Sequence, residues 1–332
     1  MARYLYPLTF EPRFRDYLWG GRNLEAFGRR LPAGIVAESW DISGHPSSPT
    51  PIDAGPYQGR LLTELLDELG LDLVGVHNQR ALERGRFPLL VKLLDANQDL
   101  SVQVHPDDDY AQKHEGGELG KTEMWYVLRA VPGARLIYGL RRGITRERFV
   151  QALQAGTLES CLHYLPVQAG DAIFIPAGTV HALLAGLVVA EIQQNSDTTY
   201  RVYDWNRVGP DGQPRPLHIE KALEVIDFSQ VEPGPYAPQL VEAREEVQRE
   251  VISRCQYFTV EKVRLASGVT WAGHCTGETF EIWGCIEGEC RITWAGDPVP
   301  LSPVRFVLLP AALGQFAVEA RSPSTLLRVY VE

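Results

Sequence analysis

The chain has 332 residues, of which 42 are acidic and 32 are lysine or arginine, so its formal net charge is −10. This balance excludes a general nucleic-acid-binding protein, because such proteins present a basic face to the phosphate backbone. The length suggests roughly two domains, and no apolar run reaches the roughly 18 residues of a membrane span. The N-terminal segment also lacks the apolar core of a signal peptide.

Five cysteines are present, and four of them lie in the last third of the chain: Cys161, Cys255, Cys275, Cys285 and Cys290. An odd number without a CxxC pair or a secretion signal favours free thiols in a reducing compartment. We therefore expect a cytoplasmic protein.

Short apolar runs separated by Gly and Pro turns predict a mostly β architecture. In chain order we expect a helix at 61–69, strands at 88–94, 100–105, 123–128 and 134–138, a helix at 145–155, strands at 172–175, 188–193 and 201–205, and a helix at 218–228. Thr145 is suited to cap the second helix. The Pro-rich and then acidic stretch 229–250 is interpreted as a connector. Further strands are expected at 258–265, 279–286, 289–294, 305–309 and 326–331.

The two parts of this strand series resemble each other weakly. Residues 300–318 repeat the outline of 167–183, and 281–294 match the hairpin of 123–138. Two tandem β modules explain this best, one over 1–228 and one over 251–332, joined by 229–250. Gln315 or Phe316 stands about where the first module has His181. Only the first module is therefore expected to hold a metal.

Three segments of the first module place polar residues inside apolar strands. Gln103 and His105 are two residues apart, so both point to one face of a strand, and the same holds for Lys121 and Glu123. His181 follows a Pro-Gly turn at a strand entry. Two imidazoles, a carboxylate and an amide oxygen suit a divalent ion, Zn²⁺ and also Fe²⁺, Mn²⁺ or Co²⁺.

Each of these residues alone has an ordinary structural explanation. A single histidine at a strand end is usually a satisfied polar residue, and Glu123 by itself fits a solvated edge position. The combination favours a site, because burying such groups without partners costs roughly 1–3 kcal/mol each. A shared metal or substrate would supply the partners.

A fourth polar segment covers 191–205, where Glu191 lies on a strand and Arg201 opens the next one. One interpretation is a surface hairpin in which Arg201 pairs with Asp204 or Asp197 and adds little stability. The other places Arg201 at the mouth of a barrel, as a fixed cation for an anionic or enediolate oxygen.

Taken together, these segments resemble the type I phosphomannose isomerases, which are metal-dependent mannose-6-phosphate isomerases of the cupin superfamily. The matching stretches are LLVKLLDANQDLSVQVHPDD (89–108), GKTEMWYVL (120–128), GDAIFIPAGTVHAL (170–183) and EIQQNSDTTYRVYDW (191–205). Trp19-Gly-Gly and the stretch 38–43 also look like the family's N-terminal pieces. The similarity spans most of 7–228 and, more loosely, the last third, and the length is that of the compact bacterial members.

The resemblance implies tandem cupin-type β-barrels (jelly rolls) with a small helical portion, the C-terminal barrel being degenerate and without metal. It implies one Zn²⁺ per chain, held by Gln103, His105, Glu123 and His181, with the last three sufficing in compact members. The family's active-site arginine falls on Arg201. Lys121 and Glu191 fall near the reacting carbons or the substrate's oxygens.

The implied reaction interconverts mannose 6-phosphate and fructose 6-phosphate through a cis-enediolate. It needs a base near both carbons, a cation for the oxygen that gains charge and an anchor for the phosphate. We assign Arg201 to the enediolate and keep Glu191 and Lys121 as candidates for proton transfer. Lys121, Arg141 and Arg142 are candidates for the phosphate anchor.

Other functions are weighed against this one. A non-catalytic sugar-binding or regulatory cupin would lose a chemical residue, whereas the candidate ligands, lysine and arginine are all present here. An iron-dependent cupin oxygenase uses HxH spacing, and this chain has Gln-Val-His. An isomerase of free mannose stays open, while 332 residues leave no room for a nucleotidyltransferase domain. The expected partner is a small sugar phosphate, and the chain is expected to be a monomer or homodimer.

Overall fold

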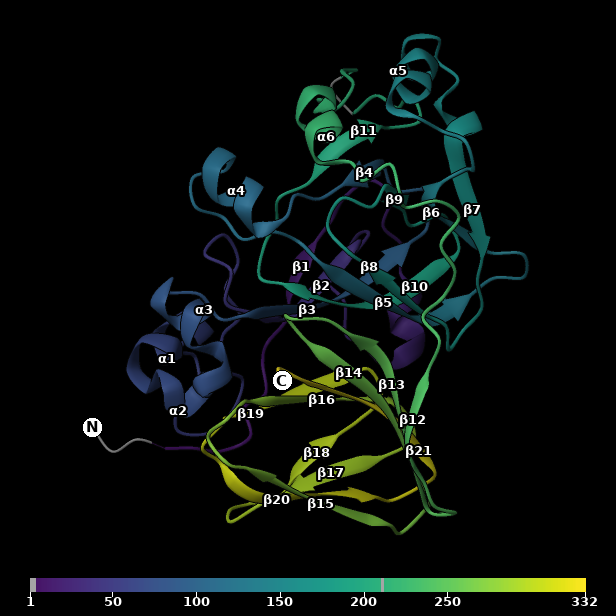
Figure 1. Cartoon of the computed structure of the whole chain (residues 1–332). Coiled ribbons are helices and arrows are strands. Elements are labelled where there is room, and N and C mark those ends of the chain that lie inside the picture. The colour runs from purple at the N-terminus through teal and green to yellow at the C-terminus, as the bar shows by residue number, and fades with distance from the viewer. Residues whose placement is uncertain (1–3, 210–211) are drawn as a thin grey trace.

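The computed structural model describes residues 4–209 and 212–332, which form two antiparallel β-barrels stacked on each other (Figure 1). Each barrel is made of two sheets that face one another. The mostly β architecture predicted from the turn pattern is confirmed. None of the helices in the described part of the chain is both long and apolar enough to cross a lipid bilayer.

The first barrel has a six-stranded and a five-stranded sheet. The strands of the larger sheet are, in spatial order, β1 (Arg13–Arg15), β2 (Glu38–Ser43), β3 (Leu89–Ala96), β10 (Leu187–Gln194), β5 (Glu123–Ala130) and β8 (Ala172–Ile175). Those of the smaller sheet are β11 (Tyr200–Tyr203), β4 (Val102–Val104), β9 (His181–Ala182), β6 (Arg135–Leu140) and β7 (Leu162–Pro166).

The second barrel repeats this arrangement in the last third of the chain. Its larger sheet has the order β12 (Gln239–Ala243), β13 (Val247–Arg254), β14 (Thr259–Leu265), β21 (Ser324–Tyr330), β16 (Glu281–Glu287) and β19 (Arg305–Leu309). Its smaller sheet has the order β15 (Thr270–Cys275), β20 (Gly314–Ala320), β17 (Cys290–Thr293) and β18 (Val299–Leu301). The equivalent strand orders agree with the tandem repeat expected from the sequence.

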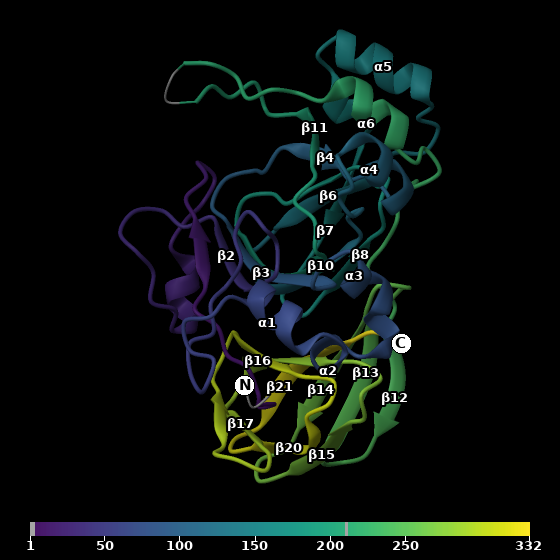
Figure 2. The same ribbon diagram turned by 90° about the vertical axis from the view of Figure 1, so that its left-hand side faces the viewer.

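Short helices cover the flanks and ends of the barrels. They are η1 (Asn23–Phe27), α1 (Leu62–Leu69), α2 (Leu71–Val74), η2 (Val76–Asn78), α3 (Gln79–Glu83), α4 (Asp108–His114), α5 (Arg146–Gln154), η3 (Leu158–Cys161) and α6 (Ile219–Val225). Helices α1 and α2 lie near the junction of the barrels, whereas α5 and α6 cap the far end of the first one (Figure 2). The expected cap of α5 is confirmed, since the Thr145 hydroxyl accepts from the Arg148 N–H.

The two larger sheets pack against each other, and this shared core positions the interior of the first barrel. Side chains alternate along a strand, so Met124 and Ile192 point outward and join Phe258 and Leu327 of the second barrel in one apolar cluster. Trp125, the neighbour of Met124, points inward into a separate cluster of the first barrel. The sheet is therefore buried on both faces, which leaves its inner polar residues away from solvent.

A buried arginine also joins the two barrels. The guanidinium of Arg29 binds both carboxylate oxygens of Asp41, at 2.6 and 2.8 Å, and donates to the Val304 carbonyl at 2.9 Å. Only 1% of the Arg29 side chain is exposed. The guanidinium therefore satisfies one buried carboxylate of the first barrel and one backbone carbonyl of the second barrel.

Replacing Arg29 by methionine is expected to destabilise the protein by about 3–5 kcal/mol, because it leaves the Asp41 carboxylate buried without its cation. The free energy of unfolding in urea measures this change. The double variant Arg29→Met/Asp41→Leu is the control and should recover much of the loss. An unchanged unfolding free energy in the single variant would show that the pair does not stabilise the junction.

One local expectation was wrong. The expected connector 229–250 contains β12 and the first residues of β13, which pair along the edge of the second barrel. Its few apolar residues reflect an exposed edge strand, as the mostly exposed residues of β12 show. Helix α4 begins at Asp108, and the Asp107 carboxylate caps it by accepting from the Tyr110 N–H at 2.8 Å. The module boundaries at 1–228 and 251–332 remain a prediction.

Candidate metal centre and active site

Paired strand positions bring the polar residues together inside the first barrel. On the smaller sheet, Arg201 lies opposite Gln103, and Gln103 lies opposite His181. On the larger sheet, Glu191 lies between Lys92 and Trp125. Directly opposed residues share a face of a sheet, so each sheet carries one row of functional side chains.

His105, Glu123 and His181 form a compact cluster between the two sheets. Their ligand atoms all lie within 4.8 Å of one another, and all three side chains are buried. The His181 Nε2 is 3.3 Å from Glu123 Oε1, and the His105 Nε2 is 3.6 Å from Glu123 Oε2. The three residues come from three segments far apart in the sequence, as the family resemblance implies.

Both histidines are oriented by backbone carbonyls. His105 Nδ1 lies 3.0 Å from the Thr198 carbonyl, and His181 Nδ1 lies 2.9 Å from the Thr179 carbonyl. A carbonyl only accepts, so each Nδ1 carries the proton and each Nε2 keeps a free lone pair. This is the arrangement that metal-binding histidines show, with the second ring nitrogen donating to a carbonyl or carboxylate.

The cluster also contains polar atoms without hydrogen-bond partners. In the described part of the chain, the Nε2 of His105 and both carboxylate oxygens of Glu123 are buried without a hydrogen bond, although the Lys121 ammonium lies 3.1 Å from Glu123 Oε2. Buried polar groups are normally satisfied. A divalent cation bound between these atoms would satisfy them, so the residues present fit a metal ion.

The electrostatics of the cluster keep these ligands in the forms that bind a metal. Burial, with help from the nearby Lys121 ammonium, lowers the pKa of His105 to about 3, so its ring stays neutral at physiological pH. Burial alone would raise the pKa of Glu123, but Lys121 and His105 hold it well below its usual value. A neutral imidazole beside an ionised carboxylate is the ligand pair that Zn²⁺ and similar ions require.

Gln103 lies at the edge of this cluster. Its side-chain amide nitrogen is 3.2 Å from His181 Nε2 and its side chain is half-buried. The oxygen and nitrogen of a side-chain amide exchange places by a half-turn of the amide. Gln103 can therefore present an oxygen to the same space as the two histidines.

A second charged group sits beside the metal cluster. Lys121 Nζ is 3.1 Å from Glu123 Oε2 and 3.8 Å from Glu191 Oε1, so it bridges the two carboxylates. The indole of Trp125 donates to Glu191 Oε2 at 2.8 Å. Burial, followed by the negative charge of Glu123, raises the pKa of Glu191. The structure thus brings Lys121 and Glu191 to the side of the cluster.

Lys92 belongs to this site, although the sequence offered only indirect signs of it. Its ammonium is 3.2 Å from Glu191 Oε1 and 3.8 Å from Glu38 Oε2, and the residue is 3% exposed. Burial would lower the pKa of Lys92, but the carboxylates of Glu191 and Glu38 raise it, so the side chain stays charged. A lysine within the apolar run LLVKLL, in a chain with only five lysines, is the signal that points to it.

Arg201 lies beyond Gln103 on the same sheet face and is half-buried. Its guanidinium donates to the Pro216 carbonyl at 2.8 Å and to the Ser101 hydroxyl at 3.3 Å. Asp204, one of the two surface partners considered for it, binds Arg207 and Arg215 instead. Burial lowers the pKa of Arg201, and the positive charge of the nearby Arg215 lowers it further.

The two arginines proposed as phosphate anchors lie elsewhere. Arg141 and Arg142 belong to the exposed turn after β6, and Arg142 approaches Glu232 at 3.7 Å with 85% of its side chain exposed. Among the described residues, neither arginine forms an ion pair or a side-chain hydrogen bond with the His105–Glu123–His181 cluster or with Glu191. The structure does not bring these two residues to the site.

The second barrel fills the equivalent interior differently. Arg328 lies opposite Trp283 on β16, as Glu191 lies opposite Trp125 on β5, and its Nε binds Glu281 at 2.9 Å. Strand β20 occupies the place of β9 in the sheet order and carries Gln315 and the buried Phe316. An arginine–carboxylate pair and an aromatic side chain thus occupy the space where the first barrel has its histidines and glutamate.

Two family models match separate parts of this chain. Residues 8–125 match the model for the phosphomannose isomerase type I catalytic domain, and residues 248–331 match the model for the mannose-6-phosphate isomerase cupin domain. The cupin character of the fold, expected from the resemblance, is confirmed.

Relatives similar over nearly the whole chain have the same description. The chain is 39% identical to a probable mannose-6-phosphate isomerase of Bacillus subtilis, GmuF, over 95% of this chain and 96% of the relative. It is 40% identical to a mannose-6-phosphate isomerase of Streptococcus mutans over 92% of both chains. The crystal structure of the mannose 6-phosphate isomerase from Bacillus subtilis superposes with a TM-score of 0.87 at 35% identity, covering 98% of this chain and 99% of that one. The chain belongs to the type I phosphomannose isomerase family.

Proposed function

We infer that this protein is a mannose-6-phosphate isomerase, which interconverts mannose 6-phosphate and fructose 6-phosphate through a cis-enediolate. One observation carries this inference in the structure. The buried cluster of His105, Glu123 and His181 lies directly beside a carboxylate–ammonium group formed by Glu191 and Lys121. An aldose–ketose isomerisation needs both a polarising centre and a proton carrier in one cavity.

We propose that His105, Glu123 and His181 hold one Zn²⁺, with Gln103 as an additional ligand. The neutral imidazole of His105, the ionised carboxylate of Glu123 and the His105 Nε2, which is buried without a hydrogen bond, support this set. When bound, such an ion supplies a Lewis acid that orients the sugar and polarises its carbonyl or hydroxyl oxygen. Imidazole and carboxylate donors suit Zn²⁺ and also Fe²⁺, Mn²⁺ or Co²⁺.

Glu191 is proposed as the base that moves the proton between C2 and C1. Burial raises its pKa toward the working range of a general base, and the Trp125 indole fixes one carboxylate oxygen while the other faces Lys92 and Lys121. The two ammonium groups can donate to the sugar oxygens that flank the transferred proton. Lys121 remains the alternative base.

Arg201 is proposed to stabilise the charge that develops on the enediolate oxygen. A guanidinium held by Ser101 and the Pro216 carbonyl is already oriented before substrate binds, and a preorganised cation is most effective in such a role. Its anchors are a hydroxyl and a carbonyl, so the positive charge is not neutralised by a carboxylate at that position.

For the phosphate anchor we propose the arginines next to Arg201. Arg207 and Arg215 line a hollow of about 230 Å³ together with Tyr17, and Asp204 holds both guanidinium groups in place. Two guanidinium groups present more donors than one carboxylate can occupy, which leaves donors for a phosphate. Cytoplasmic location and a monomeric or dimeric state remain predictions from the sequence.

A coupled isomerase assay with mannose 6-phosphate, run beside free mannose, tests the proposed function. We expect turnover of the phosphate ester, loss of turnover after chelation and recovery when Zn²⁺ is added back. Turnover of free mannose alone would identify the unphosphorylated sugar as the substrate. No turnover of either sugar by the metal-loaded protein would favour a non-catalytic sugar-binding cupin.

Replacing Glu191 by glutamine is expected to lower kcat by about 10²–10⁴-fold while bound metal is retained, because the amide keeps the shape and loses the basic oxygen. A base must be deprotonated, so kcat/KM of the unmodified enzyme should fall as pH decreases through the Glu191 pKa. Since burial raises that pKa, the acid limb should lie above the value of about 4.3 of a free glutamate.

The pH profile of residual activity separates the two candidate bases. Loss of the acid limb in the Glu191→Gln variant supports Glu191. An unchanged limb in that variant, together with its loss in Lys121→Met, would assign the proton transfer to Lys121.

A further inference from the structure

A separate hollow rich in arginine lies at the junction of the two barrels, along the edge of the first barrel's larger sheet. It has a volume of about 510 Å³ and is lined by Glu11, Pro12, Arg13, Phe14, Arg15, Arg29, Arg30, Ser48 and Arg305. Five of these nine residues are arginines and one is acidic. Such a concentration of positive charge is unexpected in a chain whose net charge is −10.

Most of these guanidinium groups lack a carboxylate partner. Arg29 is committed to Asp41. In the described part of the chain, no ion pair involves the other four, and neither Arg30 nor Arg305 donates a side-chain hydrogen bond to a described residue. Arg13 reaches only the Pro49 carbonyl at 3.4 Å, and the Arg15 guanidinium lies 5.0 Å from the centre of the Trp40 ring.

Clustered like charges repel each other, and an anion between them would relieve the repulsion. Burial, followed by the charge of Arg29, lowers the pKa of Arg305, while the carboxylates of Asp41 and Asp53 act in the opposite direction. Arg15 stacks on the buried Trp40 ring, whereas Arg13, Arg30 and Arg305 form no ion pair with a described residue and therefore leave room in this hollow for a ligand charge.

The backbone around Arg305 is held in an unusual conformation. Val304, directly before it, has φ +53°, a value that is strained for a β-branched residue. Its N–H donates to the Cys285 carbonyl at 2.7 Å and its own carbonyl accepts from Arg29 at 2.9 Å. These bonds hold the strained turn, and strain of this kind is often found at functional sites.

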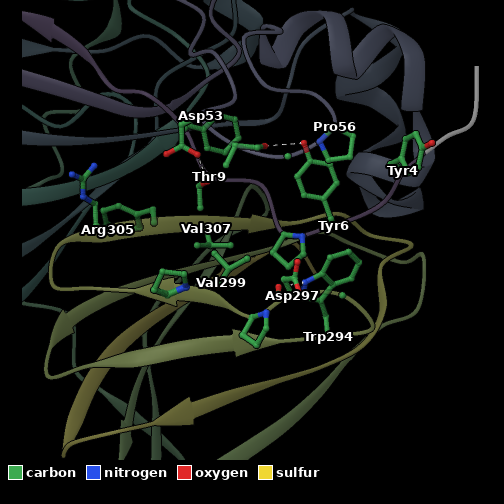
Figure 3. A pocket seen from close by; sticks show the side chains of 18 of the residues that line it. Tyr4, Tyr6, Thr9, Asp53, Pro56, Trp294, Asp297, Val299, Arg305 and Val307 are labelled. Carbon is green, nitrogen blue, oxygen red and sulfur yellow. Dashed lines mark hydrogen bonds between the residues drawn. The ribbon is translucent and has the colours of Figure 1, made fainter.

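The direction of Arg305 follows from this turn. Figure 3 shows Arg305 at one end of a neighbouring pocket lined by Tyr6 and Trp294, with its guanidinium pointing away from those rings. Arg305 lines both hollows. Its charged group is thus directed away from the aromatic pocket, on the side where the other arginines line the cleft.

We propose that this cleft binds a small molecule that carries a phosphate group, at a site separate from the cluster of His105, Glu123 and His181. The planar fork of arginine matches two phosphate oxygens, and the Ser48 hydroxyl adds a further polar group. A concave space of this size holds a phosphate and a small organic part. A nucleic acid fits less well, because the protein as a whole repels it.

Equilibrium dialysis with inorganic phosphate at low ionic strength tests the site. The unmodified protein should bind one more phosphate per chain than the double variant Arg30→Ala/Arg305→Ala, or should bind phosphate at least tenfold more tightly than that variant. The reason is that the double variant lacks two charge-assisted contacts to the phosphate. The matched control is Arg141→Ala/Arg142→Ala, which removes two arginines from an exposed turn and should behave as the unmodified protein. Isomerase turnover and the thermal midpoint of the double variant should stay near normal.

The same number of bound phosphates and the same affinity in all three proteins would overturn the proposal. The single variant Arg13→Ala replaces the double variant if the latter does not fold, with a smaller loss expected.

A parallel titration with ribose 5-phosphate distinguishes the source of the ligand. Tighter binding of the ester assigns an organic phosphate to the cleft, and equal binding assigns the free ion. A protein without isomerase activity would still give the same result in the phosphate-binding experiment. The two proposals can therefore be refuted independently.

Discussion

Replacing His181 by alanine is expected to abolish metal binding and isomerase activity together. His181 is 0% exposed, its Nδ1 is occupied by the Thr179 carbonyl and its Nε2 lies 3.3 Å from Glu123. Its removal leaves two of the three close ligands, which is fewer than a catalytic zinc site uses. We expect metal content near zero and turnover lower by at least about 10³-fold, above the cost of losing one hydrogen-bond donor to a transition state.

Metal analysis of the purified protein, together with the coupled assay, measures both effects. His163→Ala is a matched control, because His163 is half-buried and also binds a backbone carbonyl, that of Tyr138 at 2.9 Å, yet lies outside the cluster. It should keep metal and turnover. A His181→Ala protein that is folded, free of metal and fully active would refute the metal site.

Replacing Arg201 by alanine has a different expected result, because this residue contacts no member of the His105–Glu123–His181 cluster. Bound metal should stay at one ion per chain, while kcat falls by about 10²–10³-fold, the usual cost of removing a group that stabilises an oxyanion. The effect should be larger on kcat than on KM, since the charge on the oxygen develops only in the transition state.

Arg201→Lys refines this prediction. Lysine keeps the charge but lacks the fork that binds Ser101 and the Pro216 carbonyl together, so only part of the turnover should return. Arg141→Ala is the control for loss of an arginine elsewhere and should leave kcat unchanged. Near-normal turnover in Arg201→Ala would remove this residue from the mechanism.

The period-two pattern of the strands explains why part of the site could be predicted from the sequence. Gln103 with His105, and Lys121 with Glu123, are each two residues apart, so their shared faces follow from strand geometry alone. The predicted strands 88–94, 123–128 and 188–193 correspond to β3, β5 and β10 within a few residues. Such local patterns can be predicted from the sequence, because each one depends only on the geometry of its own strand.

Other parts of the site depend on contacts between distant segments. Lys92 lies in an apolar run and gains its role only because β3 and β10 pair so that it faces Glu191. The arginines after β6 had the right chemistry for a phosphate anchor but lie on an exposed turn, whereas Arg207 and Arg215 are gathered by Asp204. Edge strand β12 was mistaken for a connector because exposed edge positions carry few apolar residues.

The order of polar and apolar residues along the chain determined the β architecture, the repeat and the residue types that could bind a cation, since these follow from short-range alternation and composition. The tertiary structure alone decided that both larger sheets bury their outer faces against each other, and that Glu123, Glu191 and the two lysines form one buried charged cluster. It also decided that Arg13, Arg30 and Arg305, which form no ion pair with a described residue, line one hollow at the barrel junction. The physical reason is that burial and the distances between charges depend on how segments far apart in the sequence pack, and neither quantity is encoded in any single stretch of residues.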